Sequence, residues 1–253
     1  MKKTILSLGL LASVSVAAQA QDSGGIRLGV KVGATYSSLN GSSASQITGT
    51  SATSDLGSYK LGYNVGIGTS FPLTSDGFIS FAPELLYNRK GYELTSQQSS
   101  GFPAGSNISK IEKIEFEQQR VLHYLDAPLL ARINAGGLFF ELGPQVSFLF
   151  GSKNKQQTTT KFTNGPDIKT ENDGKFQNYT GAFQSGSDKS DLAQFDIAGV
   201  AGIGYQTDGG LSLGLRYAQG FNSIIDSKDT RNEPKAFNTA FTLQLGYLLP
   251  LGK

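Results

Sequence analysis

The chain has 253 residues, a formal net charge of +2 and no cysteine. The lack of cysteine excludes disulfide bridges, thiolate metal sites, thiol nucleophiles and a lipid-anchored cysteine, and so small a net charge gives no indication of a nucleic-acid partner. Hydrophobic residues make up 38% of the chain, and none of its stretches after residue 20 is long and apolar enough for a membrane helix.

Residues 1–20 have the features of an export signal. Lys2 and Lys3 precede an apolar segment, Ile5–Val16, and Ala18-Gln19-Ala20 supplies the small residues of a cleavage site. The apolar segment is too short to cross about 30 Å of hydrocarbon as a helix. We therefore expect residues 1–20 to be removed on export, and residues 21–253 to form one domain.

From Ile26 onward, apolar and polar residues alternate along the chain. In Ile26–Tyr36 the even positions are apolar, Ala34 included, and the odd positions are Arg27, Lys31, a threonine and glycines. A period of two places these two sets on opposite faces of a β-strand. Seven later segments repeat the pattern: Tyr59–Phe71, Ile79–Asn88, Val121–Ile133, Leu138–Phe150, Phe195–Tyr205, Leu211–Tyr217 and Phe237–Tyr247.

The connections between these segments alternate in length. The short ones follow the second, fourth and sixth segments and carry glycine turns: residues 72–77, 134–137 and 207–210. The others are long and polar: residues 39–58, 91–115, 151–192 and 222–236. Outer-membrane barrels have this arrangement, with the short turns in the periplasm. The sequence therefore predicts an all-β fold, an eight-stranded antiparallel transmembrane β-barrel with short periplasmic turns and long extracellular loops.

The polar faces of the predicted strands carry charges of both signs, which we expect to form a network in the lumen. Its predicted members are Arg27, Lys31, Lys60, Glu84, Asp126, Arg132, Glu141, Asp196 and Arg216. Eight strands leave only enough room for side chains to fill the interior, so we expect a filled lumen and no large pore. A two-residue turn at Gly136-Gly137 would place Arg132 opposite Glu141 as an ion pair near the periplasmic rim.

Three prolines conflict with this pattern. Pro83, Pro128 and Pro144 lie inside predicted strands, where each removes a hydrogen-bond donor from the ladder. We expect bulges or local breaks at these positions.

Several ordered motifs resemble a known family. They are GVKVGATYSSLNG (29–41), SFAPELLYNRKGYE (80–93), HYLDAPLLARI (123–133), GLFFELGPQVSFLF (137–150), DIAGVAGIGYQTDGGLSLGLRY (196–217) and the closing FTLQLGYLL (241–249). Together they resemble the PorT-like outer-membrane β-barrel proteins over nearly the whole mature chain. The resemblance implies an eight-stranded outer-membrane barrel. Most members have no demonstrated activity, and the link of one member to protein secretion does not carry over.

Enzymatic interpretations lack a suitable constellation of residues. His123 is the only histidine, and it lies on the lipid-facing side of its strand, whereas Ser147 and Asp126 lie on the inward side. A general base must lie within about 3 Å of its nucleophile, so opposite faces argue against a hydrolase. Glu84 and Asp126 could form a glycosidase-like carboxylate pair, but in a lumen without a cleft a structural polar network is favoured.

Aromatic residues near the strand ends favour interfacial girdles, with a sugar-binding ladder as the alternative. They are Tyr36, Phe71, Tyr87, Phe150, Tyr205 and Phe237.

The long third loop is rich in lysine. Two hypotheses follow: a solvated loop, or a loop whose lysines contact the phosphates of lipopolysaccharide. Its lysines are Lys153, Lys155, Lys161, Lys169, Lys175 and Lys189.

The sequence thus predicts a non-enzymatic, monomeric outer-membrane protein, structural or ligand-binding through its surface loops. We expect no cofactor, no metal and no nucleic acid. The expected partners are outer-membrane lipid and lipopolysaccharide, the barrel assembly machinery during biogenesis, and envelope proteins. Three alternatives remain open: an accessory subunit of a secretion or envelope complex, a lipid-modifying enzyme, and a soluble lipocalin-like carrier.

Overall fold

A computed structural model describes residues 25–41, 54–99, 111–163, 165–172, 175–177, 182–184, 192–226 and 235–251. The predicted export signal lies outside these residues. The strands are β1 (Arg27–Asn40), β2 (Ser54–Pro72), β3 (Ile79–Ser99), β4 (Ile111–Ala135), β5 (Leu138–Phe162), β6 (Ile168–Asn172), β7 (Lys175–Gln177), β8 (Ala182–Gln184), β9 (Phe195–Gln206), β10 (Leu211–Gly220) and β11 (Phe237–Pro250). None of the described residues belongs to a helix long and apolar enough to cross a membrane.

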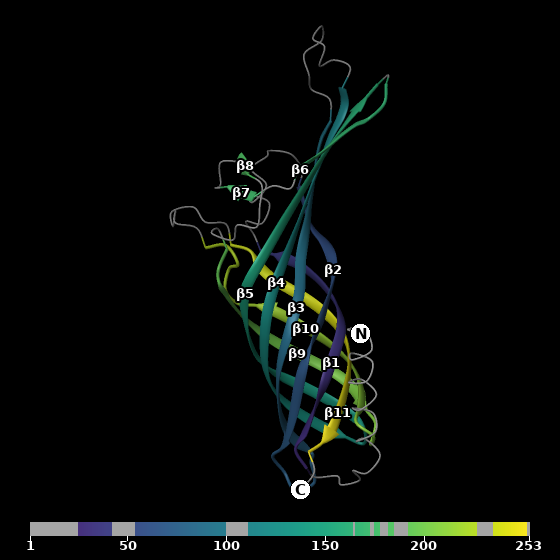
Figure 1. The fold of residues 1–253 in the computed structure, drawn as a ribbon, viewed down its shortest axis with the longest axis vertical. Helices are drawn as coiled ribbons and strands as arrows, with labels where there is room; N and C mark the ends of the chain where they lie inside the picture. Colours follow the sequence, from purple (N-terminus) through teal and green to yellow (C-terminus); the bar gives the residue numbers. More distant parts are fainter. Residues whose placement is uncertain are drawn as a thin grey trace, which may run out of the picture.

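Eight of these strands close into an antiparallel barrel (Figure 1). Around the ring the order is β1, β2, β3, β4, β5, β9, β10 and β11, and β11 pairs with β1 to complete it. All eight predicted strands are present, and the predicted fold class is confirmed. Because the strand number is even, Arg27 of β1 lies beside Pro250 of β11 at the same end of the barrel.

The polarity of the barrel wall is the reverse of that of a soluble protein. Val30 is 62% exposed, Ile67 51%, Phe140 49% and Leu243 53%, although all four are apolar. The residues between them face inward and are mostly polar or glycine, and Lys31 and Glu141 are buried. A lipocalin-like carrier would bury the apolar set in its cavity, so this wall does not fit a soluble carrier and fits a hydrocarbon surrounding.

The short turns lie at the end of the barrel opposite the long connections. Gly136 and Gly137 have φ angles of 60° and 89°, in the left-handed region that glycine adopts without strain. This two-residue turn sets the β4–β5 register and places Arg132 opposite Glu141, as the sequence predicts.

The three strand prolines coincide with local breaks in the ladders. The β3–β4 and β4–β5 ladders each skip two residue pairs beside a proline and then resume without a register shift. Beside Pro83, the Thr69 hydroxyl donates a hydrogen bond of 3.0 Å to the proline carbonyl. The prolines therefore interrupt the ladders without bulging the strands.

The predicted loop boundaries are wrong on one side of the barrel. Residues 91–99 and 111–115 belong to β3 and β4, and residues 151–162 and 168–172 belong to β5 and β6. These strands continue beyond the barrel as a projecting sheet (Figure 1), which we call the extracellular sheet. Its residues are polar on both faces, so they lack the alternation that predicts strands in the barrel. The loop lysines therefore lie largely on strands: Lys153, Lys155 and Lys161 on β5, Lys169 on β6 and Lys175 on β7, with Lys189 outside the described residues.

Candidate functional site in the barrel lumen

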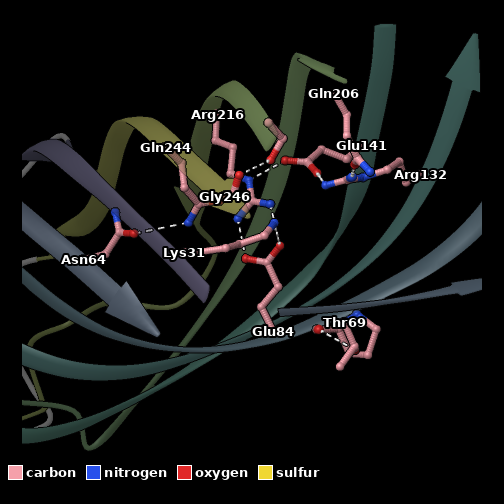
Figure 2. A network of polar contacts seen from close by, with 12 residues as sticks. Lys31, Asn64, Thr69, Glu84, Arg132, Glu141, Gln206, Arg216, Gln244 and Gly246 are labelled. Atoms are coloured by element: carbon pink, nitrogen blue, oxygen red, sulfur yellow. Dashed lines mark hydrogen bonds and ion pairs between the residues drawn. The ribbon is translucent and has the colours of Figure 1, made fainter. Parts of the chain in front are cut away.

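Five charged residues and Gln206, which together come from six strands, form one connected chain of contacts in the lumen (Figure 2), which we call the lower charge group. Its members in order of contact are Lys31 (β1), Glu84 (β3), Arg216 (β10), Glu141 (β5), Arg132 (β4) and Gln206 (β9). All of them except Gln206 are buried. Contacts between strands so far apart in the ring mean that these side chains cross the lumen.

Arg216 is the centre of the lower charge group. Its Nη1 and Nη2 atoms each lie 2.7 Å from a carboxylate oxygen of Glu84, a bidentate pair, and its Nε donates to Glu141. Glu84 also accepts a hydrogen bond from Lys31 Nζ. Glycines make room for these large side chains, since a Cβ atom on Gly202 would lie 2.9 Å from the Glu141 side chain and 3.1 Å from that of Arg216.

Arg132 completes the lower charge group toward the periplasmic end. Its Nη2 lies 3.2 Å from Glu141 Oε2, and its Nη1 donates to Gln206 Oε1 at 2.8 Å. The guanidinium carbon also lies 4.0 Å from the centre of the Phe139 ring. Each carboxylate of the group therefore contacts two cations, which compensates the cost of burying charge.

A second set of polar residues, the upper charge group, lies nearer the extracellular end. Asp126 Oδ2 accepts from Lys90 Nζ at 2.9 Å and from Asn88 Nδ2 at 2.8 Å, while Asp196 Oδ2 accepts from Asn238 Nδ2 at 2.7 Å. Lys90 also lies 5.0 Å from the centre of the Tyr124 ring. Lys90 is not among the predicted lumen residues, because it lies two residues beyond the predicted end of its strand at Asn88.

Two predicted members of the network lie outside both groups. Lys60 is half-buried and donates a hydrogen bond of 2.7 Å to Gln119 of β4. Arg27 lines a cavity of about 220 Å³ at the periplasmic mouth, together with Asp76 and Asp208. In the turn beside it, hydrogen bonds from the Thr74 hydroxyl and the Phe78 amide lower the pKa of Asp76. Parity along the strand predicts the face of a residue, but not whether it lies mid-lumen or at the rim.

Apolar side chains close the extracellular mouth of the barrel, a feature that the sequence reasoning missed. Leu192 and Ile225 form an isolated bridge, and the Leu149 amide donates to the Gln194 carbonyl at 2.8 Å. The buried cluster, here called the apolar cap, comprises Leu39, Tyr92, Leu122, Tyr124, Leu149, Leu192, Ile224, Ile225 and Ala236. The chain segments around residues 192 and 224 therefore fold into the mouth instead of extending into solvent.

The structure separates His123 from the other two candidate catalytic residues, Ser147 and Asp126, which lie opposite each other on β5 and β4. His123 faces outward, and its Nδ1 lies 2.8 Å from the Tyr87 hydroxyl, whereas Ser147 and Asp126 are completely buried inside. Glu84 and Asp126 bind different cations in the two charge groups. Within the described residues, no three of the His, Asp and Glu side chains lie together in a way that could hold a metal ion.

Comparison with known families agrees with this architecture. The family described as outer membrane protein beta-barrel domain matches residues 17–226. The chain belongs to this family. It is accordingly an outer-membrane protein, and its strands cross the membrane with the apolar faces toward lipid. No curated protein sequence matches the chain.

Solved structures with some similarity include two proteins described as outer-membrane proteins. The attachment invasion locus protein Ail of Yersinia pestis has 12% identity and a TM-score of 0.35, covering 89% of this chain and 99% of its own. OprG of Pseudomonas aeruginosa has 12% identity and a TM-score of 0.32, covering 90% and 98%. The outer membrane protease OmpT of Escherichia coli has 9% identity and a TM-score of 0.32, covering 93% and 100%.

Proposed function

We propose that this protein is a non-enzymatic outer-membrane barrel of the PorT-like kind, exported by its N-terminal signal, that acts as a structural element and displays the extracellular sheet for ligand binding. The observation that carries the proposal is the filled lumen. The lower charge group spans the interior from six strands, and the apolar cap closes the mouth above it. A barrel of eight strands has an interior just wide enough for side chains to fill, and in this barrel the charged side chains occupy it.

The non-enzymatic part of the proposal is supported by the surroundings of the reactive side chains. His123 is directed to the lipid-facing wall and binds the Tyr87 hydroxyl, and its ring lies 6.2 Å from that of Phe150, centre to centre. Ser147 accepts a hydrogen bond from Gln145 inside the barrel at 3.0 Å. Ser147 lies opposite Asp126 and Asp196 on the neighbouring strands, but all three side chains are buried in the lumen, away from the lipid-facing wall where a lipid substrate would lie.

Planar-bilayer recording tests the filled lumen. We expect the refolded full chain to insert without sustained conductance steps, and we expect the same of a His123→Ala variant because His123 lies outside the lumen. Stable conductance of the wild-type protein would contradict the proposal. In parallel, cells expressing the wild-type chain and His123→Ala should have identical lipid A profiles. A modification made by the wild type and lost in the variant would show an enzyme.

One observation favours a second function, as an accessory subunit of an envelope or secretion complex. β6 lies at the end of the sheet order and pairs only with β5 among the described strands, so one side of this strand offers free hydrogen-bonding groups. Purification in mild detergent separates the two functions. A stoichiometric envelope protein bound to the chain favours the accessory role, whereas a monomer without a partner favours the structural one.

A further inference from the structure

An aromatic cluster marks the upper edge of the lipid-facing wall on β2 to β5. The Tyr87 ring lies at its centre, with ring centres 5.9 Å from Tyr63, 6.1 Å from His123 and 5.9 Å from Phe150. Aromatic residues of this kind lie at the boundary between hydrocarbon and headgroups. Residues immediately beyond this cluster therefore lie at the level of the lipid headgroups of the outer leaflet.

Two cationic side chains lie directly at this level. Arg89 pairs with His123 across β3 and β4, and Lys153 pairs with Val121 across β4 and β5. Their Cα atoms are therefore separated by two strand spacings and two residues, roughly 12 Å. No side chain projects from Gly151, which lies between them beside His123. A Cβ atom at Gly151 would lie 3.3 Å from the His123 ring.

Arg89 and Lys153 differ in their surroundings from the remaining lysines of β4 and β5. Lys113 and Lys161 both pair with Glu115 at 2.8 and 3.0 Å, and Lys155 pairs with Glu171 at 3.2 Å. Arg89 and Lys153 form no ion pair with any described carboxylate, and Lys153 is exposed. Arg89 donates one long hydrogen bond of 3.5 Å to the Leu61 carbonyl of β2. With no described carboxylate beside either side chain, both positive charges are available to an anion from outside the protein.

We propose that Arg89 and Lys153 form a binding site for a phosphate group of an outer-leaflet lipid, the phosphorylated sugar headgroup of lipopolysaccharide. The aromatic cluster fixes the depth of the site, and the phosphate lies over His123 and Val121 where both long side chains reach it. Guanidinium and ammonium groups are the side chains that bind phosphate most strongly. Lys153 lies at the base of the extracellular sheet, so the site needs only the insertion of the barrel in the outer membrane and no ligand on the outer part of the sheet.

The test compares two double variants of the full chain refolded in detergent. Arg89→Gln with Lys153→Gln removes the site, and Lys169→Gln with Lys235→Gln removes two exposed lysines elsewhere. Affinity is measured for purified phosphorylated lipopolysaccharide and for the same lipid after dephosphorylation. We expect the site variant to bind the phosphorylated lipid roughly tenfold to thirtyfold more weakly than wild type. The control variant should stay within about twofold, because its lysines do not contact the phosphate.

Three results would overturn the assignment. The first is that wild type and site variant bind the phosphorylated lipid equally well, and the second is that the control variant loses as much affinity as the site variant. The third is that an equal concentration of inorganic phosphate displaces the lipid. The dephosphorylated lipid should not distinguish the variants. If the double variant fails to fold, the single Lys153→Gln change at an exposed position provides the same comparison. A variant that retains both charges, Arg89→Lys with Lys153→Arg, should restore binding.

Discussion

The lumen and the extracellular sheet use the same charged residue types in opposite ways. In the lumen, the side chains that pair in the lower charge group are at most 7% exposed. In the sheet, Lys161 and Glu115 are 39% and 30% exposed, and Lys155 and Glu171 are 49% and 57% exposed. Similar distances therefore carry different energies, since water screens the sheet pairs and leaves the lumen pairs nearly unscreened.

The difference in burial also explains why replacing a single charged residue of the lumen is expected to destabilise the barrel. Glu84 lies between Lys31 and Arg216, and Glu141 lies between Arg216 and Arg132. Removal of one carboxylate leaves two cations close together in a water-poor interior. In the sheet, removal of one partner leaves a hydrated charge, which costs little.

The largest effect is expected from Glu84→Gln. The change keeps the size of the side chain but leaves Lys31 and Arg216 without their shared carboxylate, so we expect the free energy of unfolding to fall by about 3–5 kcal/mol. Urea titration of the refolded barrel in detergent micelles, followed by the heat-dependent mobility of the folded form on gels, measures this change.

The matched control is Glu115→Gln in the extracellular sheet. It removes the partner of Lys113 and Lys161, and we expect no resolvable change in barrel unfolding because the pairs are exposed. Equal effects of the two substitutions would show that burial does not distinguish the two regions.

A smaller effect is expected where the barrel wall is too tight for an added methyl group. A Cβ atom on Gly66 would lie 2.0 Å from the Leu85 carbonyl oxygen and 2.8 Å from Leu86 Cα, both in the backbone. We expect Gly66→Ala to lower the free energy of unfolding by about 1–3 kcal/mol in the same titration. Gly25 serves as the control, because a Cβ atom there would have no other atom within 4 Å. Gly25→Ala should leave stability unchanged, and a loss equal to that of Gly66→Ala would argue against tight packing as the cause.

The barrel could be predicted from the sequence because lipid imposes an alternation on every strand. The turn at Gly136-Gly137 then fixed one register, from which the contact between Arg132 and Glu141 follows. The extracellular sheet has water on its outside, and its polar residues show no alternation from which its strands could be predicted. Leu130 and Val200 are apolar but occupy inward-facing strand positions, like the charged residues. The alternation of apolar and polar residues therefore could not predict that they cluster inside the lumen.

The smallest effect is a pH dependence confined to the extracellular sheet. Burial and the nearby carboxylate of Glu117 raise the pKa of Glu93, against the opposing charge of Lys60. A raised pKa in the folded state means that Glu93 favours folding below its ordinary value of 4.5, and that this contribution is lost as the pH rises through the folded pKa. We expect amide exchange in the outer part of β3 and β4, corrected for intrinsic rates, to be slower near pH 5 than near pH 8.

The Glu93→Gln variant should lose this trend, because its amide does not titrate. The pKa of Glu115 on the same sheet is shifted in the opposite direction, because hydrogen bonds from Lys113 and Lys161 lower it. Its contribution is present above the ordinary carboxyl value and is lost as the pH falls through the lowered one. Glu115→Gln should therefore leave the difference between pH 5 and pH 8 intact. If protection instead increased toward pH 8 in the wild-type protein, the pairing of Glu93 with Glu117 would not control the local stability of this sheet.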